Sequence, residues 1–266
     1  KSALLRWAGD AAAAAGAFVL RTSGSEGTVP FDALRRLVAP VPELSLLLAS
    51  ESARRAPAST AEDALRRALL ASQVRSVYQA EGPVWEIEFA PDGESYAFAS
   101  EDGWARVLVT ATGEESLSFE VGPDGGVSFG SGFLLVHGDG GPPRALDPAT
   151  GEVRCTIGDR PVADAAAAGR LAVVVRNGIG YVWEVDRCSL LHTLGRVGET
   201  AVRVRASPTG TRAAFLSGPE ARVVDVEAGR IVSLLTHEGK IANLEFSEGA
   251  DRVVTGGREG RVRLWN

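Results

Sequence analysis

The sequence has no methionine and only two cysteines and two lysines among its 266 residues. Cys155 and Cys188 lie far apart and in no C-x-x-C pair, so we expect neither a zinc site nor a disulfide framework. These features predict a reduced, intracellular and cytoplasmic chain. Lys is confined to Lys1 and Lys240 while Arg, Ala and Gly are abundant, which indicates a GC-rich, bacterial genome. Because an initiator Met is missing and the sequence stops abruptly at "RVRLWN", we expect a fragment of a longer protein.

A net positive charge and long hydrophobic runs are also missing. The formal net charge is −6, which provides no positive field for phosphate backbones, so nucleic-acid binding is not expected. The apolar run "AAAAAGAFVL" at 11–20 has about half the length of a membrane-spanning helix. We interpret it as a soluble helix, without membrane insertion by this segment, although a membrane segment further upstream stays open. The apolar fraction of 45% is typical of a soluble globular protein.

Motifs for catalysis and cofactor binding are missing as well. The sequence contains no G-x-x-x-x-G-K-[ST], H-E-x-x-H or G-x-S-x-G. Its three histidines, His137, His192 and His237, lie far apart, and the glycine clusters at 137–143 and 176–180 lack the strand-to-helix context of a phosphate loop. We therefore predict no catalytic residue, no cofactor and no metal, and the chain is not expected to be an enzyme.

The chain divides into two parts with different periodicity. Residues 30–72 place apolar side chains at three- and four-residue spacing, and Thr60 with Asp63 resembles a capping box. We therefore predict an α-helical linker segment over residues 1–72. From residue 73 onward, glycine turns alternate with short period-two runs, which predicts β-strands over 73–266.

The second part repeats with a period of 37 to 41 residues. One apolar position follows the second turn of each unit, at Leu108, Leu146, Trp183, Val224 and Trp265. The first turn recurs at Gly93, Gly132, Gly169, Gly210 and Gly249. A period near 40 with four short strands fits one blade of a β-propeller. The predicted fold is mainly β, with five repeats of four-stranded blades after a small helical segment.

The repeats resemble WD-repeats. The best match is "THEGKIANLEFSEGADRVVTGGREGRVRLWN", which ends on Trp265-Asn266 in place of Trp-Asp, and the first copy is "AEGPVWEIEFAPDGESYAFASEDGWARVLV". The resemblance covers 73–266 and implies a structural hydrogen-bond network of His, Ser or Thr, Asp and Trp in each blade. No repeat keeps all four residues, so we expect blades held more by apolar packing. The candidate network residues are Ser100, Asp102, Trp183, His237, Thr255 and Trp265, with Glu259 where the last repeat should have Asp.

The resemblance leaves two arrangements of the repeats open. Five units close into a ring if "QVRSVYQ" at 73–79 supplies the outer strand of the last blade. Otherwise the repeats form an open arc cut from a longer propeller. We prefer the open arc because seven blades are usual in the family.

A second resemblance covers about fifty residues around the junction, from "PELSLLLASESARR" to "EIEFAPDG". This region is similar to the junction of bacterial STAND-type signalling proteins, in which an NTPase module is followed by helices and a WD-repeat sensor. It implies a sensor role, and any NTPase module would lie upstream of Lys1.

Two functions follow as hypotheses. The first is a non-enzymatic scaffold or sensor module that binds a protein or peptide through its loops. Its candidate contacts are three aromatic residues taken as exposed turn residues and two arginines of the last repeat: Trp85, Trp104, Tyr181, Arg258 and Arg261. The alternative is a hydrolase or lactonase with acids, Asn or His converging on a central channel, which a channel of apolar and small residues would exclude.

Overall fold

The computed structural model describes residues 75–199 and 202–266. The predicted helical segment 1–72 and the predicted domain boundary lie outside these residues. Residues Tyr78–Asn266 form one compact unit. The part of the chain that is described has no helix long and apolar enough to cross a membrane.

The described residues form five antiparallel sheets that follow one another along the chain. The first sheet contains β1 (Val84–Phe89), β2 (Ser95–Ser100), β3 (Trp104–Val109) and β4 (Glu115–Glu120), and the second contains β5 (Gly126–Phe129), β6 (Leu134–Gly138), β7 (Gly141–Leu146) and β8 (Val153–Thr156). The third contains β9 (Asp164–Ala168), β10 (Leu171–Arg176), β11 (Ile179–Glu184) and β12 (Ser189–Arg196). The fourth contains β13 (Arg203–Ala206), β14 (Arg212–Ser217), β15 (Glu220–Asp225) and β16 (Arg230–Thr236), and the fifth contains β17 (Ile241–Phe246), β18 (Val253–Gly257) and β19 (Val262–Trp265).

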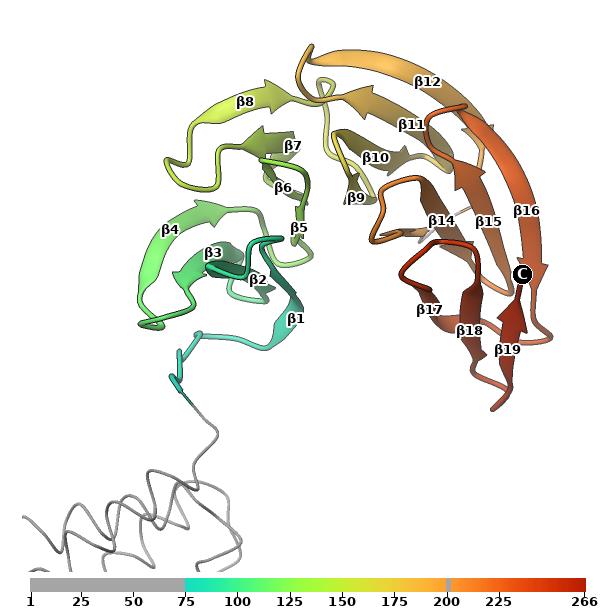
Figure 1. Ribbon diagram of the computed structural model, residues 1–266, viewed down its shortest axis with the longest axis horizontal. Helices are drawn as coiled ribbons and strands as arrows, with labels where there is room; N and C mark the ends of the chain where they lie inside the picture. The colour runs from blue at the N-terminus through green and yellow to red at the C-terminus, as the bar shows by residue number, and fades with distance from the viewer. Residues whose placement is uncertain (1–74, 200–201) are drawn as a thin grey trace, which may run out of the picture. The chain divides into compact units, whose positions relative to one another are not determined.

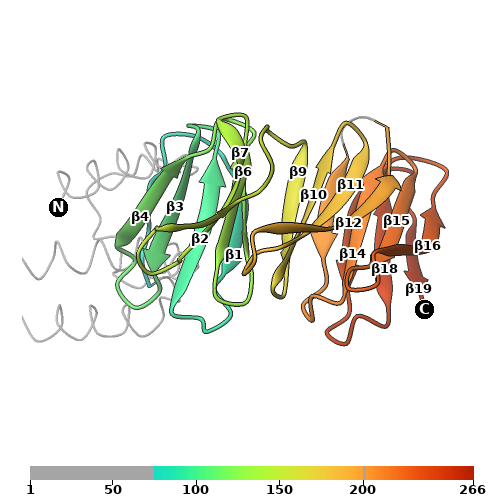
Figure 2. The same ribbon diagram turned by 90° about the horizontal axis from the view of Figure 1, so that it is seen from above.

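Each sheet is a meander whose strands pair in chain order. The first strands of successive sheets contact one another, and they lie on the inside of a curve with the fourth strands outside (Figure 1). Turned by 90°, the sheets stand side by side in chain order (Figure 2). The mainly-β prediction is thereby confirmed for the described residues as a β-propeller-like repeat fold.

The predicted repeat positions coincide with equivalent points of the five sheets. The apolar positions from Leu108 to Trp265 all fall on the third strand of a sheet. The first-turn glycines lie between the first and second strands, and Gly93 and Gly210 have φ of 73° and 71°. That left-handed backbone favours glycine, so these turns are fixed locally by the sequence.

The core consists of apolar layers between neighbouring sheets. Ala97 and Val107 of the first sheet pack with Val127 and Leu134 of the second. Three further clusters join the second sheet to the third, the third to the fourth and the fourth to the fifth. Burial between sheets therefore requires a neighbour on each side, as expected for stacked repeats.

The prediction of an outer strand at 73–79 is wrong for its described residues. Residues 75–79 form no strand, and the fifth sheet has three strands. Tyr78 instead packs on the first sheet, with its ring 5.5 Å from that of Phe98 and its hydroxyl donating to Glu115. A tyrosine with an apolar ring and a polar tip fits this half-covered position, so the described residues form an open series and not a five-sheet ring.

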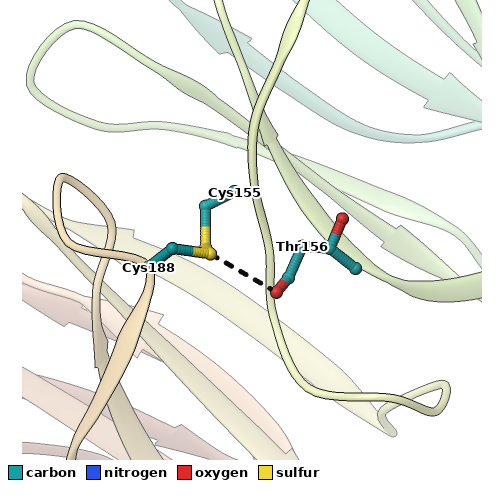
Figure 3. Close-up of a disulfide and its surroundings, with 3 residues drawn as sticks. All are labelled: Cys155, Thr156 and Cys188. Atoms are coloured by element: carbon teal, nitrogen blue, oxygen red, sulfur yellow. Dashed lines mark hydrogen bonds between the residues drawn. A yellow bond between two sulfur atoms is a disulfide. The ribbon is translucent and has the colours of Figure 1, made fainter.

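The prediction of unpaired cysteines is also wrong, because Cys155 and Cys188 form a disulfide (Figure 3). Their Cα atoms lie 5.2 Å apart, within the usual range for a bridge. Cys155 lies on β8 of the second sheet and Cys188 in the turn before β12 of the third. Their separation of 33 residues is close to one repeat, and packing of adjacent sheets brings such positions together. The Cys188 sulfur also lies 3.6 Å from the Thr156 carbonyl oxygen, a contact without a proton to share.

Candidate functional site

The first strands form the inner edge of the sheets, and side chains from one sheet cap the backbone of the next. The Glu86 carboxylate accepts a hydrogen bond from the Val127 N–H at 3.1 Å, and Glu88 accepts one from the Phe129 N–H at 3.0 Å. These bonds run from β1 to β5. An edge strand otherwise leaves such N–H groups without a partner.

Side chains of the second and third sheets also accept backbone N–H groups of the following sheet. The Ser128 hydroxyl accepts from the Ala167 N–H at 3.1 Å, which joins β5 to β9. Asp164 accepts from the Val204 N–H at 2.8 Å, which joins β9 to β13. Between the fourth and fifth sheets, β13 carries Arg203 and Arg205. Their side chains have no acceptor atom and cannot accept an N–H of the next sheet. The acids of the inner edge therefore have a structural role between the first four sheets.

Five charged or titratable side chains gather at this edge, and we call them the inner cluster: Glu86, Glu88, His137, Asp164 and Arg205. The His137 Nε2 lies 3.3 Å from Asp164 Oδ1 without a hydrogen bond between them. Arg205 Nη1 lies 3.7 Å from Glu86 Oε1, so β13 reaches back to β1. The cluster thus combines groups from all of the first four sheets.

Gly126 allows this convergence. A Cβ on Gly126 would lie 2.5 Å from both Glu86 Oε2 and His137 Nε2. Any side chain at this position would push one of the two groups away. Gly126 pairs with His137 across β5 and β6, which brings the imidazole and the carboxylate to the same point.

Protein surroundings shift the pKa values of three cluster members. Burial, with the Asp164 charge nearby, raises the pKa of Glu86 to about 7, although Arg205 opposes the shift. Burial also raises the pKa of Glu88. It lowers the pKa of His137, against the attraction of Asp164, so the imidazole is neutral at pH 7. The cluster therefore contains a carboxyl group that changes its charge near neutral pH.

Sequence patterns did not identify the inner cluster. Glu86 and Asp164 stand in different repeats, about two periods apart in the sequence, so no short motif joins them. The available signal was the charged residue inside the otherwise apolar first strand of a repeat. Within the ranges 75–199 and 202–266, no group of three His, Cys, Asp or Glu side chains is arranged to hold a metal ion.

The predicted network of the last repeat is connected by hydrogen bonds. Trp265 Nε1 donates to the Thr255 hydroxyl at 2.8 Å, and Thr255 Oγ1 lies 2.7 Å from His237 Nε2. His237 Nδ1 lies 2.5 Å from Glu259 Oε1. Glu259 thus occupies the role expected of an Asp, and its pKa is lowered mainly by the hydrogen bond with His237. A chain of hydrogen bonds thus runs from Trp265 to Glu259 Oε1, while the buried Glu259 Oε2 has no hydrogen-bond partner among the described residues.

In the first repeat the network consists of Ser100, Asp102 and an arginine, Arg106. The Ser100 hydroxyl donates to Asp102 at 2.5 Å, and Arg106 pairs with Asp102 at 2.8 Å. Burial works to raise the pKa of Asp102, but the hydrogen bonds from Ser100, Trp104 N–H and Arg106 lower it overall. Arg106 therefore replaces the missing His and Trp. Trp183 lies half-buried beside the core between the second and third sheets.

Of the residues predicted to bind a partner, the two tryptophans and Arg258 are exposed, whereas Tyr181 is half-buried. Trp85 is the second residue of β1, with 58% of its surface exposed, and Trp104 begins β3 with 39% exposed, so both lie at strand starts and not in turns. Tyr181, predicted as an exposed turn residue, lies half-buried within β11, packed on the core and 5.7 Å from the Arg176 guanidinium. Arg258 is exposed between β18 and β19.

Trp85 and Trp104 lie on one edge of the sheets, which we call the rim: the strand starts and turns at 80–85, 101–104, 122–125 and 138–141. Trp85 Nε1 donates to the Pro123 carbonyl oxygen at 3.2 Å, and the Gly122 N–H donates to the Gly103 carbonyl oxygen at 3.0 Å. A cleft of about 560 Å³ lies beside the rim, and the end of β4 and the β6–β7 hairpin line it. Arg258 and Arg261 occupy the equivalent turn of the fifth sheet, where Arg261 pairs with Glu238.

The sequence matches neither a protein-family model nor a curated protein. Among solved structures, the crystal structure of the computationally designed Ika8 protein is similar, with a TM-score of 0.56 and 17% identity. The match covers 70% of this chain and 59% of that chain. At this identity the similarity concerns the fold alone, and it agrees with a β-propeller-like repeat of antiparallel sheets.

Proposed function

We propose that residues 73–266 form a WD-repeat β-propeller module that binds a protein or peptide through its rim. The module acts as a non-enzymatic scaffold or sensor within a longer bacterial signalling protein. The observation that carries this proposal is the exposure of Trp85 and Trp104 at the rim ends of β1 and β3. Large aromatic side chains contribute much of the binding energy in protein interfaces, and a rigid sheet scaffold holds their loops in place.

Both tryptophans stand outside the apolar layers between the sheets. Trp85 is anchored by its indole N–H on Pro123, while its ring remains open to solvent. Trp104 follows the Asp102 turn, which Ser100 and Arg106 hold in place. The exposed rings are thus positioned in advance, and binding would cost little side-chain ordering.

The hydrolase or lactonase alternative has one observation in its favour, the inner cluster. A carboxyl group with a pKa of about 7 next to a neutral imidazole is a combination found in acid–base sites. However, Glu86, Glu88 and Asp164 each already accept a backbone N–H of the neighbouring sheet. A structural role for these acids therefore supports the interaction module over the enzyme.

The WD-repeat and STAND-type assignments rest on the sequence resemblance. The complete Trp265–Thr255–His237–Glu259 chain supports the first of them. Location in the reducing cytoplasm stays a prediction, and it loses the support of unpaired cysteines because disulfides persist mainly in oxidising compartments.

Selection from a random twelve-residue peptide display library tests the proposal. Peptides selected on the wild-type chain should lose at least ten-fold in affinity on a Trp85→Ala/Trp104→Ala double variant. Phe89→Ala is the matched control, since Phe89 is an exposed aromatic residue at the other end of β1. Peptides that bind the double variant as tightly as the wild type would contradict the proposal.

A further inference from the structure

The inner cluster contains more hydrogen-bond acceptors than the described residues satisfy. Glu86 Oε2 and Asp164 Oδ2 each accept a backbone N–H, and Asp164 Oδ1 accepts the Ala165 N–H at 2.9 Å. Glu86 Oε1 has Arg205 Nη1 only at 3.7 Å, which is too long for a hydrogen bond. Acceptor capacity thus remains on carboxylates that face the inner edge.

His137 adds a buried ring nitrogen that has no hydrogen-bond partner among the described residues. Its side chain is only 4% exposed, yet Nε2 has no hydrogen-bond partner in the described part of the chain. Nε2 lies 3.3 Å from Asp164 Oδ1, and both Nε2 and Glu86 Oε2 lie 2.5 Å from the position that a Cβ on Gly126 would take. A neutral imidazole whose proton is on Nδ1 presents a lone pair at Nε2. In that tautomer Nε2 lies close to carboxylate oxygens with no proton between them, which is unfavourable until a donor binds there.

The cluster is reachable from solvent at the rim. The side chains of Glu86 and Asp164 are 31% and 16% exposed. Gly126 and Asp164 are the first residues of β5 and β9, so Glu86, His137 and Asp164 lie at the rim end of the inner edge, while Glu88 lies further along β1. Trp85, one residue before Glu86, is part of that rim.

We propose that the inner cluster binds one cationic side chain of the partner, an Arg guanidinium or a Lys ammonium, inserted from the rim. This inference deepens the proposed function and rests on it. Such a group carries several N–H donors for Glu86 Oε1, for the remaining lone pair of Asp164 Oδ1 and, when the imidazole proton is on Nδ1, for His137 Nε2. Hydrogen bonds between a cation and carboxylates are about twice as strong as neutral ones.

The charges around the cluster support a cation. Among the residues that the structure describes, the cluster holds three carboxyl groups, Glu86, Glu88 and Asp164, and one guanidinium, that of Arg205. The Arg205 guanidinium hydrogen-bonds to the carbonyl oxygen of Val204 at 2.9 Å and does not complete a hydrogen bond to Glu86. The Arg205 guanidinium therefore already lies near Glu86. It would compete for the Glu86 carboxylate with a cationic side chain of the partner.

A peptide titration followed by NMR tests the proposal with the full chain at pH 8. The probes are Gly-Ser nonapeptides with one central Arg, Lys, citrulline or Gln. Citrulline has the shape of Arg without its charge, so the Arg peptide should bind at least ten-fold more tightly and should shift the His137 imidazole signals. The Lys peptide should likewise exceed the Gln peptide.

Three variants sharpen the test. Glu86→Gln keeps an acceptor for Val127 N–H but removes the charge, and it should weaken Arg-peptide binding about ten-fold. The matched control Glu94→Gln, an exposed acid at the far end of the first sheet, should leave binding unchanged. Arg205→Gln should tighten binding several-fold, a gain that misfolding cannot produce.

Equal affinity for the Arg and citrulline peptides would overturn the inference, as would equal weakening by Glu94→Gln and Glu86→Gln. Unchanged His137 signals at saturating peptide would also overturn it. Library-selected peptides that need Trp85 and Trp104 but contain no basic residue would refute the cation site and leave the interaction module intact. Loss of all dependence on the two tryptophans would instead refute the proposed function.

Discussion

Thr255 is the central link of the hydrogen-bond chain in the fifth sheet, and replacing it with Val removes only a hydroxyl. Thr255 is fully buried and joins the Trp265 indole to the His237 imidazole. Valine has nearly the same shape, so the apolar packing is preserved. The substitution therefore isolates the hydrogen bonds from the volume of the side chain.

The magnitude follows from two lost hydrogen bonds. Each contributes about 1 kcal/mol, and a buried His237 nitrogen left without a partner costs about 1–3 kcal/mol more. Trp265 is partly exposed, so its N–H can recover some bonding to water. We expect Thr255→Val to lower the free energy of unfolding by about 2–4 kcal/mol.

Urea unfolding at pH 7, monitored by tryptophan fluorescence, measures the effect. Thr255→Ser retains the hydroxyl and should recover most of the lost stability. Thr193→Val, an exposed threonine on β12, is the control for a change of residue type. If Thr255→Val and Thr255→Ser unfold within about 0.5 kcal/mol of each other, apolar packing holds this sheet together and the hydrogen-bond chain does not.

Three further predictions concern other parts of the molecule. Cys155→Ser/Cys188→Ser should lower the free energy of unfolding by about 3–4 kcal/mol, because the bridge closes a loop of 33 residues; calorimetry should show the same loss when the wild type is reduced, and no change on reduction would contradict it. Glu86 has a folded-state pKa of about 7 against 4.5 in the unfolded chain, so the folded state holds the extra proton and stability falls as pH rises from about 4.5 to 7. Glu86→Gln should remove this decline, of order 1–3 kcal/mol, in urea titrations; the depressed pKa of His137 acts with the opposite sign, and an unchanged pH profile would refute the shift. Gly126→Ala should destabilise by about 1–3 kcal/mol and change the His137 NMR signals, because its Cβ would lie 2.5 Å from two cluster atoms; unchanged signals would show that the cluster is not packed against Gly126.

The repeated sheets were predictable because their signals are local. The turn at Gly93 needs a left-handed backbone, which favours glycine. The strand after the second turn places an apolar residue such as Leu108 in the core. These constraints act within about ten residues, so one copy could be read and then matched to the others. The positions of the third strands followed directly.

The contacts between sheets were not predictable in the same way. The disulfide joins β8 to the turn before β12, and Glu86 caps the Val127 N–H from a distance of 41 residues. Nothing near Cys155 indicates which later residue will face it. The strand expected at 73–79 failed for a related reason, because the partner that would pair with it belongs to the opposite end of the series.

One part of the candidate site was predictable from local sequence signals, and the other part depends on contacts between sheets. Trp85, Trp104 and Tyr181 were singled out from the sequence because aromatic residues contribute binding energy at interfaces when the core does not need them, and of the three Tyr181 lies half-buried on the core. His137 was set aside as an isolated histidine, since its neighbours Glu86 and Asp164 come from other repeats. Only the packing of the inner edge brings the three groups together.

Hydrogen exchange on the complex with a library-selected peptide tests the central claim, that the rim binds a partner, most directly. Backbone amides of the rim at 80–85, 101–104 and 122–125 should exchange at least ten-fold more slowly in the complex, while the turns at 90–94 and 110–114 on the opposite edge should not change. Protection confined to that opposite edge, or to the exposed strand β19, would contradict the account.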